Sequence, residues 1–276
     1  MSGRIARRFE ALKREGRGGL VTFLTAGDPD HATSAAILDA LPGAGADLVE
    51  LGMPFSDPMA DGPAIQAANL RALANGASLA RTLDLARAFR ARHTDTPLVL
   101  MGYYNPIYIM GVERFTATAR EAGVDGLIVV DLPPEEVDEL KDHAQRAALD
   151  IVRLATPTSD DARLDRILEG ASGFLYYVAV AGITGTKSAD RDSIAQAVAR
   201  IRRHTAMPVA VGFGIRTPEQ AAEAASLADA AVVGSALVQE IARAAEAGRP
   251  ERAIESVPRL VKSLADAVRA RAGAAS

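Results

Sequence analysis

Eight short apolar segments recur along this chain, and each is followed by a stretch with helical spacing. The segments are rich in Val, Ile and Leu and too short for helices, as expected of strands that are buried on both faces of a sheet. The predicted strands are 20–24, 47–51, 97–101, 126–130, 151–154, 174–178, 208–211 and 230–233. The predicted helices after them are 31–41, 79–92, 112–122, 135–148, 160–168, 194–203, 219–227 and 254–271. This alternation predicts a parallel sheet with helices outside it.

The fold class that suits this pattern is α/β, and within it a (β/α)8 TIM barrel. A length of 276 residues fits that barrel with modest insertions, which we expect after the second and sixth strands. No Pro/Gly/Ser-rich linker divides the chain, so we expect a single domain over 1–276, with an extra amphipathic helix within 1–16. The competing arrangement is an open doubly wound sheet. Against it, the first strand–helix turn (25–29) lacks the three-glycine dinucleotide pattern.

Composition excludes several classes of protein. The net charge is −4, and acidic and basic residues are interspersed, so neither nucleic acid nor a membrane surface is an expected partner. No apolar stretch is long enough to span a bilayer. Cysteine is absent, which removes disulfides and thiolate chemistry, and the four histidines lack metal-ligand spacing, so we expect no metal site. The N-terminus lacks the apolar core of a signal peptide, which favours a cytoplasmic location.

Two carboxylates in different surroundings stand out as candidate catalytic groups. Glu50 lies within the predicted strand 47–51, where alternation directs it inward with Leu48 near the strand's C-terminal end. Catalytic groups of such barrels lie at that end, and burial there would raise the pKa of Glu50 toward neutrality. Asp61 follows in a loop broken by Pro54 and Pro58, which we expect to be polar and to keep it ionised. A carboxylate pair of this kind is typical of divided acid and base roles.

Glycine-bearing turns follow the last three predicted strands, at 181–186, 212–215 and 234–235. Barrels commonly bind phosphate at the turns after strands seven and eight, where glycine lets backbone N–H groups approach an anion. The segment from Ser235 has helical character, so its first N–H groups would face a bound phosphate. Tight turns without a ligand are the alternative explanation. The polar loop 183–193 is equally consistent with a lid and with an ordinary surface loop.

These motifs resemble those of the tryptophan synthase α subunits over essentially the whole chain. The resemblance is carried by 49–62 (VELGMPFSDPMADG), with support from 22–29, 101–106, 182–185, 212–215 and 234–235. It implies reversible retro-aldol cleavage of indole-3-glycerol phosphate to indole and glyceraldehyde 3-phosphate. It also implies that Glu50 transfers protons and that Asp61 accepts the indole N–H. Val180 departs from the arginine of some family members, which puts a lid contact of that arginine in doubt.

The resemblance further implies which residues meet the substrate and the partner. On the indole side these are Phe23, Met101, Tyr103, Ile128, Tyr176, Thr184 and Phe213, although packing is the favoured role for Ile128. Those near the phosphate are Gly185, Gly214, Gly234 and Ser235. Asp57 is the expected contact to a tryptophan synthase β subunit in an αββα assembly. Pyridoxal phosphate is expected in that partner, and no cofactor is expected in this chain.

Two rival functions are compatible with the sequence. One is another phosphate-binding barrel enzyme of aromatic biosynthesis, which would share the glycine turns but not the Glu50 and Asp61 pair. The other is a non-catalytic barrel subunit that chiefly activates a β partner. An assay of indole release, with and without a β subunit, distinguishes these alternatives.

Overall fold

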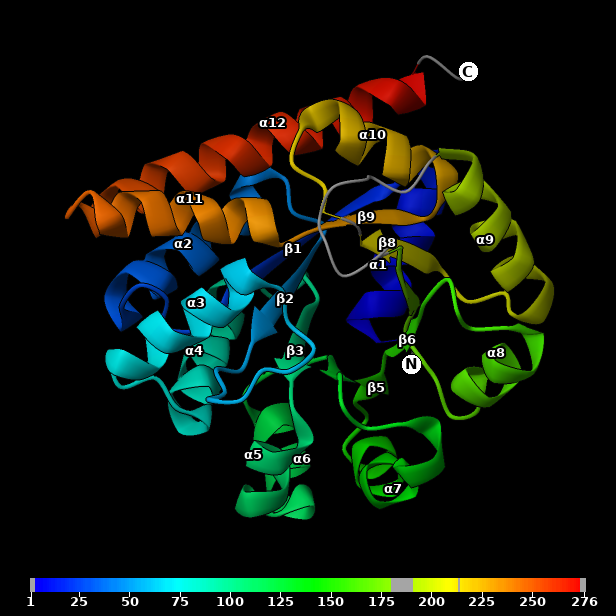
Figure 1. Ribbon diagram of the computed structural model, residues 1–276, viewed down its shortest axis with the longest axis horizontal. Helices are drawn as coiled ribbons and strands as arrows, with labels where there is room; N and C mark the ends of the chain where they lie inside the picture. The colour runs from blue at the N-terminus through cyan, green and yellow to red at the C-terminus, as the bar shows by residue number, and fades with distance from the viewer. Residues whose placement is uncertain (1–2, 180–190, 213, 274–276) are drawn as a thin grey trace.

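The computed structural model describes residues 3–179, 191–212 and 214–273. Within them, parallel strands form one sheet that curls into a barrel surrounded by helices (Figure 1). The strands are β1 (Gly19–Thr25), β2 (Leu48–Gly52), β3 (Leu98–Gly102), β4 (Gly126–Val129), β5 (Asp150–Ile151), β6 (Arg153–Ala155), β7 (Leu175–Val178), β8 (Val209–Gly212) and β9 (Ala230–Val233). Their order in the sheet is β5-β4-β3-β2-β1-β9-β8-β7-β6.

The fifth predicted strand, 151–154, is wrong in one respect, because the structure divides it into β5 and β6. β5 pairs with β4, whereas β6 pairs with β7, so the chain changes neighbours at Val152. The N–H of Val152 donates to the carbonyl oxygen of Leu127 on β4 at 2.9 Å. The two ends of the sheet are therefore consecutive in the chain, which closes the barrel and excludes the open doubly wound sheet.

Helices follow the strands much as the sequence predicts. They are α1 (Arg4–Arg14), α2 (His31–Ala44), α3 (Pro63–Ala74), α4 (Leu79–Arg92), α5 (Tyr104–Met110), α6 (Val112–Glu121), α7 (Asp138–Arg146), α8 (Asp161–Leu168), α9 (Arg191–His204), α10 (Pro218–Leu227), α11 (Ser235–Glu246) and α12 (Ala253–Gly273). Two 3₁₀ turns, η1 (Pro134–Glu136) and η2 (Pro250–Arg252), precede α7 and α12. The predicted helix 135–148 thus begins with a separate 3₁₀ turn, and α5 was not predicted. None of the described helices is long and apolar enough to span a bilayer.

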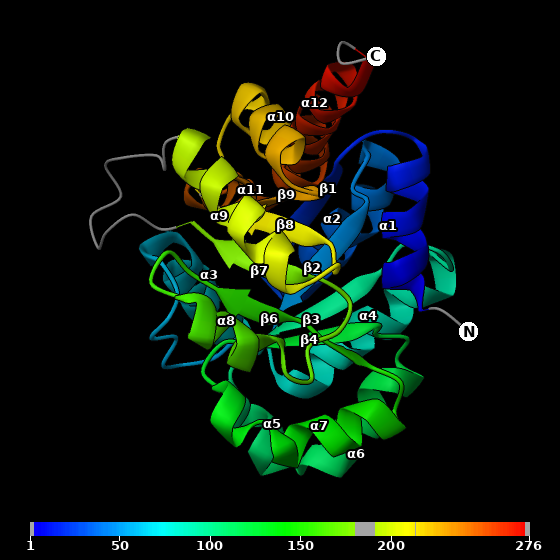
Figure 2. The ribbon, with the colours of Figure 1, turned by 90° about the vertical axis from the view of Figure 1, so that its right-hand side faces the viewer.

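Side chains of each strand alternate between the barrel interior and the helical layer, as β2 illustrates. Val49 and Leu51 belong to the large core between the sheet and the helices. Leu48 instead packs inside the barrel, where the apolar face of α1 closes the N-terminal end of the strands (Figure 2). Phe9 of α1 lies 5.7 Å from Phe174 between ring centroids. The predicted N-terminal helix is therefore confirmed, and it completes the interior core.

Three aspartates fasten the same end of the barrel. Asp47, Asp125 and Asp229 each directly precede a strand. Each accepts a backbone N–H from the neighbouring strand at 2.8–3.0 Å. Arg17 binds Asp47 through two nitrogens at 2.8 and 2.9 Å. Arg4, on α1, binds Asp125 at 2.9 Å. These interactions join the strands to one another and to α1.

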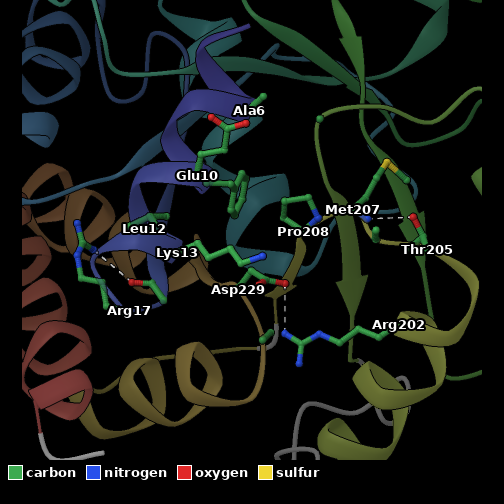
Figure 3. Close-up of a pocket in the computed structure, with 16 residues that line it drawn as sticks. Ala6, Glu10, Leu12, Lys13, Arg17, Arg202, Thr205, Met207, Pro208 and Asp229 are labelled. Carbon is green, nitrogen blue, oxygen red and sulfur yellow. Dashed lines mark hydrogen bonds and ion pairs between the residues drawn. The ribbon is translucent and has the colours of Figure 1, made fainter. Parts of the chain in front are cut away.

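A cavity of about 760 Å³ also opens at this end, between α1 and the segment that leads into β8 (Figure 3). Lys13 of α1 and Pro208 line it from opposite sides, and Arg202 is paired with Asp229 at 3.3 Å. In barrels of this class, the N-terminal end of the strands serves stability, whereas chemistry takes place at the C-terminal end. The functional site is therefore expected at the opposite end of the barrel.

Candidate active site

Glu50 lies in the barrel interior near the C-terminal end of β2, as the alternation predicts. Its side chain is fully buried, and neither carboxylate oxygen has a hydrogen-bond partner among the described residues. Burial therefore raises the pKa of Glu50 from 4.5 to about 8. At neutral pH the group is mostly protonated and close enough to its pKa both to give and to take a proton.

Apolar side chains and one tyrosine surround Glu50. Phe23 of β1 is its register partner, and Met101 of β3 packs with Phe23 in one small cluster. The other members of that cluster come from α3 and α11 and are Ile65, Ala68 and Val238. Tyr176 of β7 faces the carboxylate, and burial together with the charge of Glu50 raises the pKa of Tyr176 well above its ordinary value. The structure thus brings Phe23, Met101 and Tyr176 together around the acid.

Glycines at the ends of two strands make room for the aromatic rings. A Cβ on Gly212 would lie 2.2 Å from Oη of Tyr176, and one on Gly52 would lie 2.6 Å from Cζ of Phe23. Contacts this short do not occur in proteins without displacement of one partner. Gly212 and Gly52 therefore fix the positions of the two rings in the barrel mouth.

Asp61 is held over the mouth by a buried amide and a tyrosine. Nδ2 of Asn69, on α3, donates to Oδ2 of Asp61 at 3.3 Å, and Oδ1 of Asn69 accepts the N–H of Phe55 at 3.2 Å. The Tyr103 hydroxyl accepts the N–H of Ala60 at 3.0 Å, and its ring packs 5.2 Å from that of Phe55. The side chains of Asn69 and Tyr103 therefore each contact both the start and the end of the loop between β2 and α3.

The carboxylate of Asp61 is partly withdrawn from solvent within its loop. Burial raises the pKa of Asp61 to about 6, and hydrogen bonds from Tyr103 and Asn69 partly oppose that rise. Most of the loop is exposed, at Ser56, Asp57, Met59 and Ala60, but it folds back onto α3 at Asp61 and removes that carboxylate from part of the solvent. The side chain is nevertheless mostly ionised at neutral pH, and its pKa lies about two pH units below that of Glu50.

An ion pair anchors α3 to the loop that follows β1. Asp28 is fully buried, and its two carboxylate oxygens accept from Nε and Nη2 of Arg71, each at 2.9 Å. Asn75, one turn further along α3, donates to the carbonyl oxygen of Pro29 at 2.6 Å. Because α3 carries Asn69, this pair sets the position from which the amide reaches Asp61.

The described part of the predicted phosphate site lies beside the acid. A Cβ on Gly234 would lie 3.2 Å from Cβ of Phe23, so this turn abuts the register partner of Glu50. α11 begins at Ser235, where the first N–H groups of the helix have no partner within it. Gly214 has a φ of +43°, which favours glycine, and a Cβ there would meet nothing within 4 Å. These backbone groups lie at the C-terminal ends of β8 and β9, where the sequence predicts a phosphate site.

Several predicted site residues lie elsewhere or outside the described residues. Thr184, Gly185 and Phe213 belong to the segments that the structure does not describe, as do Val180 and most of the predicted lid, 183–193. Ile128 is fully buried in the interior cluster that α1 closes, which agrees with packing as its favoured role. Asp57 is exposed on the loop between β2 and α3. No group of three metal-ligating side chains occurs among residues 3–179, 191–212 and 214–273.

Sequence reasoning missed Asn69, whose contacts link the two halves of the acidic loop. One signal was available: Asn69 falls on the apolar side of α3, one turn after Ile65 and between Ala68 and Ala72. A buried amide on such a face needs partners, because an unpaired polar group in a core is costly.

Comparison with known proteins agrees with the fold. The family model for the tryptophan synthase alpha chain matches residues 9–269. The chain is 40% identical to a tryptophan synthase subunit alpha from Legionella pneumophila, with a TM-score of 0.89 over 97% of this chain and 99% of that one. A structure from Aquifex aeolicus is 40% identical, with a TM-score of 0.87 over 96% of this chain and 99% of that one. Tryptophan synthase from M. tuberculosis matches at 32% identity and a TM-score of 0.86, covering 98% and 100%. The chain therefore belongs to the tryptophan synthase alpha-chain family, whose members act as lyases in tryptophan synthesis.

Proposed function

We propose that the chain cleaves indole-3-glycerol phosphate reversibly to indole and glyceraldehyde 3-phosphate. The observation that carries this proposal is the Glu50 carboxyl group, fully buried in the barrel mouth and with a pKa of about 8. A carboxyl group in that state can donate a proton to carbon and then accept one from a hydroxyl within a single turnover.

In this mechanism protonated Glu50 donates to C3 of the indole ring, and a positive charge develops on the ring nitrogen. Ionised Asp61 accepts the indole N–H and stabilises that charge. The Glu50 carboxylate then takes the proton of the glycerol hydroxyl adjacent to the ring. The carbon–carbon bond breaks as the aldehyde forms, its electron pair restores the aromatic ring, and Glu50 is again protonated.

The surroundings of Glu50 suit the two ends of this substrate. Phe23 and Met101 offer an apolar wall to the indole ring, and Tyr103 borders the loop that carries Asp61. The start of α11 at Ser235 and the turn at Gly214 offer backbone donors to the phosphate. Within this proposal, Thr184, Gly185 and Phe213 complete the two subsites.

We further propose that the C-terminal end of the barrel docks onto a tryptophan synthase β subunit in an αββα assembly. Met59, Tyr108 and Ile109 are 82%, 61% and 76% exposed, which is unusual for such large apolar side chains. Met59 lies on the loop after β2, and the other two lie on α5. The loop and α5 are neighbours, because the residue before α5, Tyr103, bonds to the loop.

Asp57 lies exposed on the same loop and is the proposed ionic contact to that partner. Movement of this loop would also move Asp61, four residues further on, so that docking and catalysis are coupled. Pyridoxal phosphate belongs to the β subunit in this proposal, and the proton transfers described above use only side chains of the α chain.

The test is indole release from indole-3-glycerol phosphate, measured on the isolated chain and again with a β subunit. Wild-type protein should release indole, the β subunit should increase the rate, and Glu50→Gln should abolish release in both conditions. Glu255→Gln, at an exposed position of α12, is the matched control. A chain that stimulates the β subunit but releases no indole would instead be the non-catalytic activator, and near-normal release by Glu50→Gln would refute the role of that acid.

A further inference from the structure

A second cavity, of about 610 Å³, opens at the C-terminal end of the barrel where the chain crosses from β5 to β6. It is lined by the ends of β4 and β6, by the loop 131–134, and by Thr156, Thr158 and Ser159. β4 pairs with β5 and β6 pairs with β7, so the two strands that border the cavity are not paired with each other. Neither Glu50 nor Asp61 lines it, and neither do the aromatic residues around them.

Arg153 is the unusual residue of this cavity. Its side chain projects from β6, the residue is only 6% exposed, and Nη1 donates to the carbonyl oxygen of Leu132 at 3.0 Å. Nε and Nη2 have no hydrogen-bond partner in the described part of the chain. Burial lowers the pKa of Arg153, and Glu135 only partly opposes that effect. A buried guanidinium with two unused donors is costly unless something accepts them.

The two unused nitrogens form one edge of the guanidinium, which suits a bidentate oxyanion. The same protein contains a direct precedent, because Arg71 uses its Nε and Nη2 to bind both carboxylate oxygens of Asp28 at 2.9 Å. Parallel N–H groups at this spacing match carboxylate and phosphate oxygens. Arg153 lines the cavity, and its unused edge is the same edge with which Arg71 holds an anion.

Hydroxyl groups and the charge of the lining support the same ligand chemistry. Thr156, Thr158 and Ser159 form a hydroxyl cluster, with Oγ1 of Thr156 lying 2.9 Å from Oγ1 of Thr158 and 3.3 Å from Oγ of Ser159. The charged lining residues are Arg153, Arg163 and Asp131, a net charge of +1. Arg163 is paired with Glu135, and Oδ1 of Asp131 accepts the N–H of Tyr104, so neither side chain forms an ion pair with Arg153.

We propose that this cavity is a binding site for a small oxyanion of the carboxylate or phosphate type, held by Nε and Nη2 of Arg153 and by the hydroxyls of 156–159. The site is separate from the phosphate edge at Gly234 and Ser235, and it lies at the closure of the sheet. It does not depend on the reaction proposed above.

The test follows the Nε–H signal of Arg153 in ¹⁵N-labelled full-length protein by NMR, assigned by its loss in Arg153→Lys. Inorganic phosphate and acetate are titrated separately, at an ionic strength held constant with chloride. We expect a saturable shift of this signal, and the anion with the lower half-saturation concentration identifies the class of ligand. Phosphate should also bind at the predicted site near Ser235, but binding there should not shift the Arg153 signal.

Two variants separate this site from general surface charge. Arg163→Gln removes the other guanidinium of the cavity and should retain a saturable response, whereas Thr158→Val should weaken it several-fold. A second readout is thermal unfolding in acetate, where the wild type should gain stability and Arg153→Met should not. Absence of a saturable shift with either anion would overturn the proposal, because water alone would then satisfy Arg153. An equal loss of response in Arg163→Gln would overturn it as well.

Discussion

Replacing Glu50 by glutamine should stabilise the protein at alkaline pH while it abolishes activity. In the folded state burial raises the pKa of Glu50 to about 8, whereas in the unfolded chain it has its ordinary value of 4.5. Between these values the folded protein holds a proton that the unfolded chain has lost. The free energy of unfolding therefore falls as pH rises through this interval, and the favourable contribution is complete only below about 4.5.

The size of this effect follows from the two pKa values. Each pH unit between them is worth about 1.4 kcal/mol, so the full interval corresponds to about 5 kcal/mol. Between about pH 5 and pH 8 the expected change is about 3 to 4 kcal/mol, because the titration is incomplete at both ends. Glutamine has nearly the same shape and no charge, so Glu50→Gln should gain this amount over the wild type as pH rises.

The assay is urea unfolding of wild type and Glu50→Gln at several pH values between about 5 and 8.5, with the free energies compared pairwise. All other titrating groups are common to both proteins, so their contributions largely cancel. Glu255→Gln on the surface of α12 is the control and should follow the wild type at every pH. A difference between Glu50→Gln and wild type that stays constant with pH would refute the desolvated state of Glu50 on which the mechanism depends.

Three further predictions concern other parts of the structure. The pH profile of kcat/KM should be bell-shaped, rising through about pH 6 as Asp61 ionises and falling above about pH 8. Asp61→Asn should lower kcat by about 100-fold and remove the acidic limb of that profile. Gly212→Ala should raise KM at least about tenfold, because its Cβ would lie 2.2 Å from Oη of Tyr176 and displace the ring. Asp125→Asn should lower the free energy of unfolding by about 3 kcal/mol, as measured in urea, because it breaks two largely buried ion pairs.

Each of these predictions has a specific control or contrary result. An acidic limb that persists in Asp61→Asn would assign the pKa of about 6 to another group. Gly43→Ala is the matched control for the glycine substitution, because a Cβ at Gly43 meets nothing within 4 Å. An unchanged urea midpoint for Asp125→Asn would show that the ion pairs at the N-terminal end of the barrel contribute little.

The sequence predicted those features that depend on local periodicity. Alternation along β2 placed Glu50 inside the barrel, and a glycine after an apolar run placed the start of α11 at Ser235. The division of the fifth strand at Val152 could not be predicted, because it depends on which neighbouring strand each half meets. α5 was missed because its seven residues carry a proline and are too few to show a helical period.

The electrostatics of the site could be predicted only in part, for a related reason. The high pKa of Glu50 follows from its place in an apolar strand, which the sequence already shows. The pKa of Asp61 depends on how the loop folds back onto Asn69, and that path is tertiary. Arg153 likewise looks like an ordinary outward-facing residue of a strand until the loop at Leu132 and the neighbouring helix cover it.

The position of α1 has a consequence for how the chain reaches its final form during synthesis. This helix precedes all of the described strands along the chain, yet its apolar face packs against Phe174, and its Arg4 binds Asp125. The helix therefore has no complete binding surface until more than half of the polypeptide has emerged. A helix that is translated before the strands it closes is thus among the last elements to find its permanent neighbours, and a fusion partner attached ahead of it would interfere with the final step of assembly rather than the first.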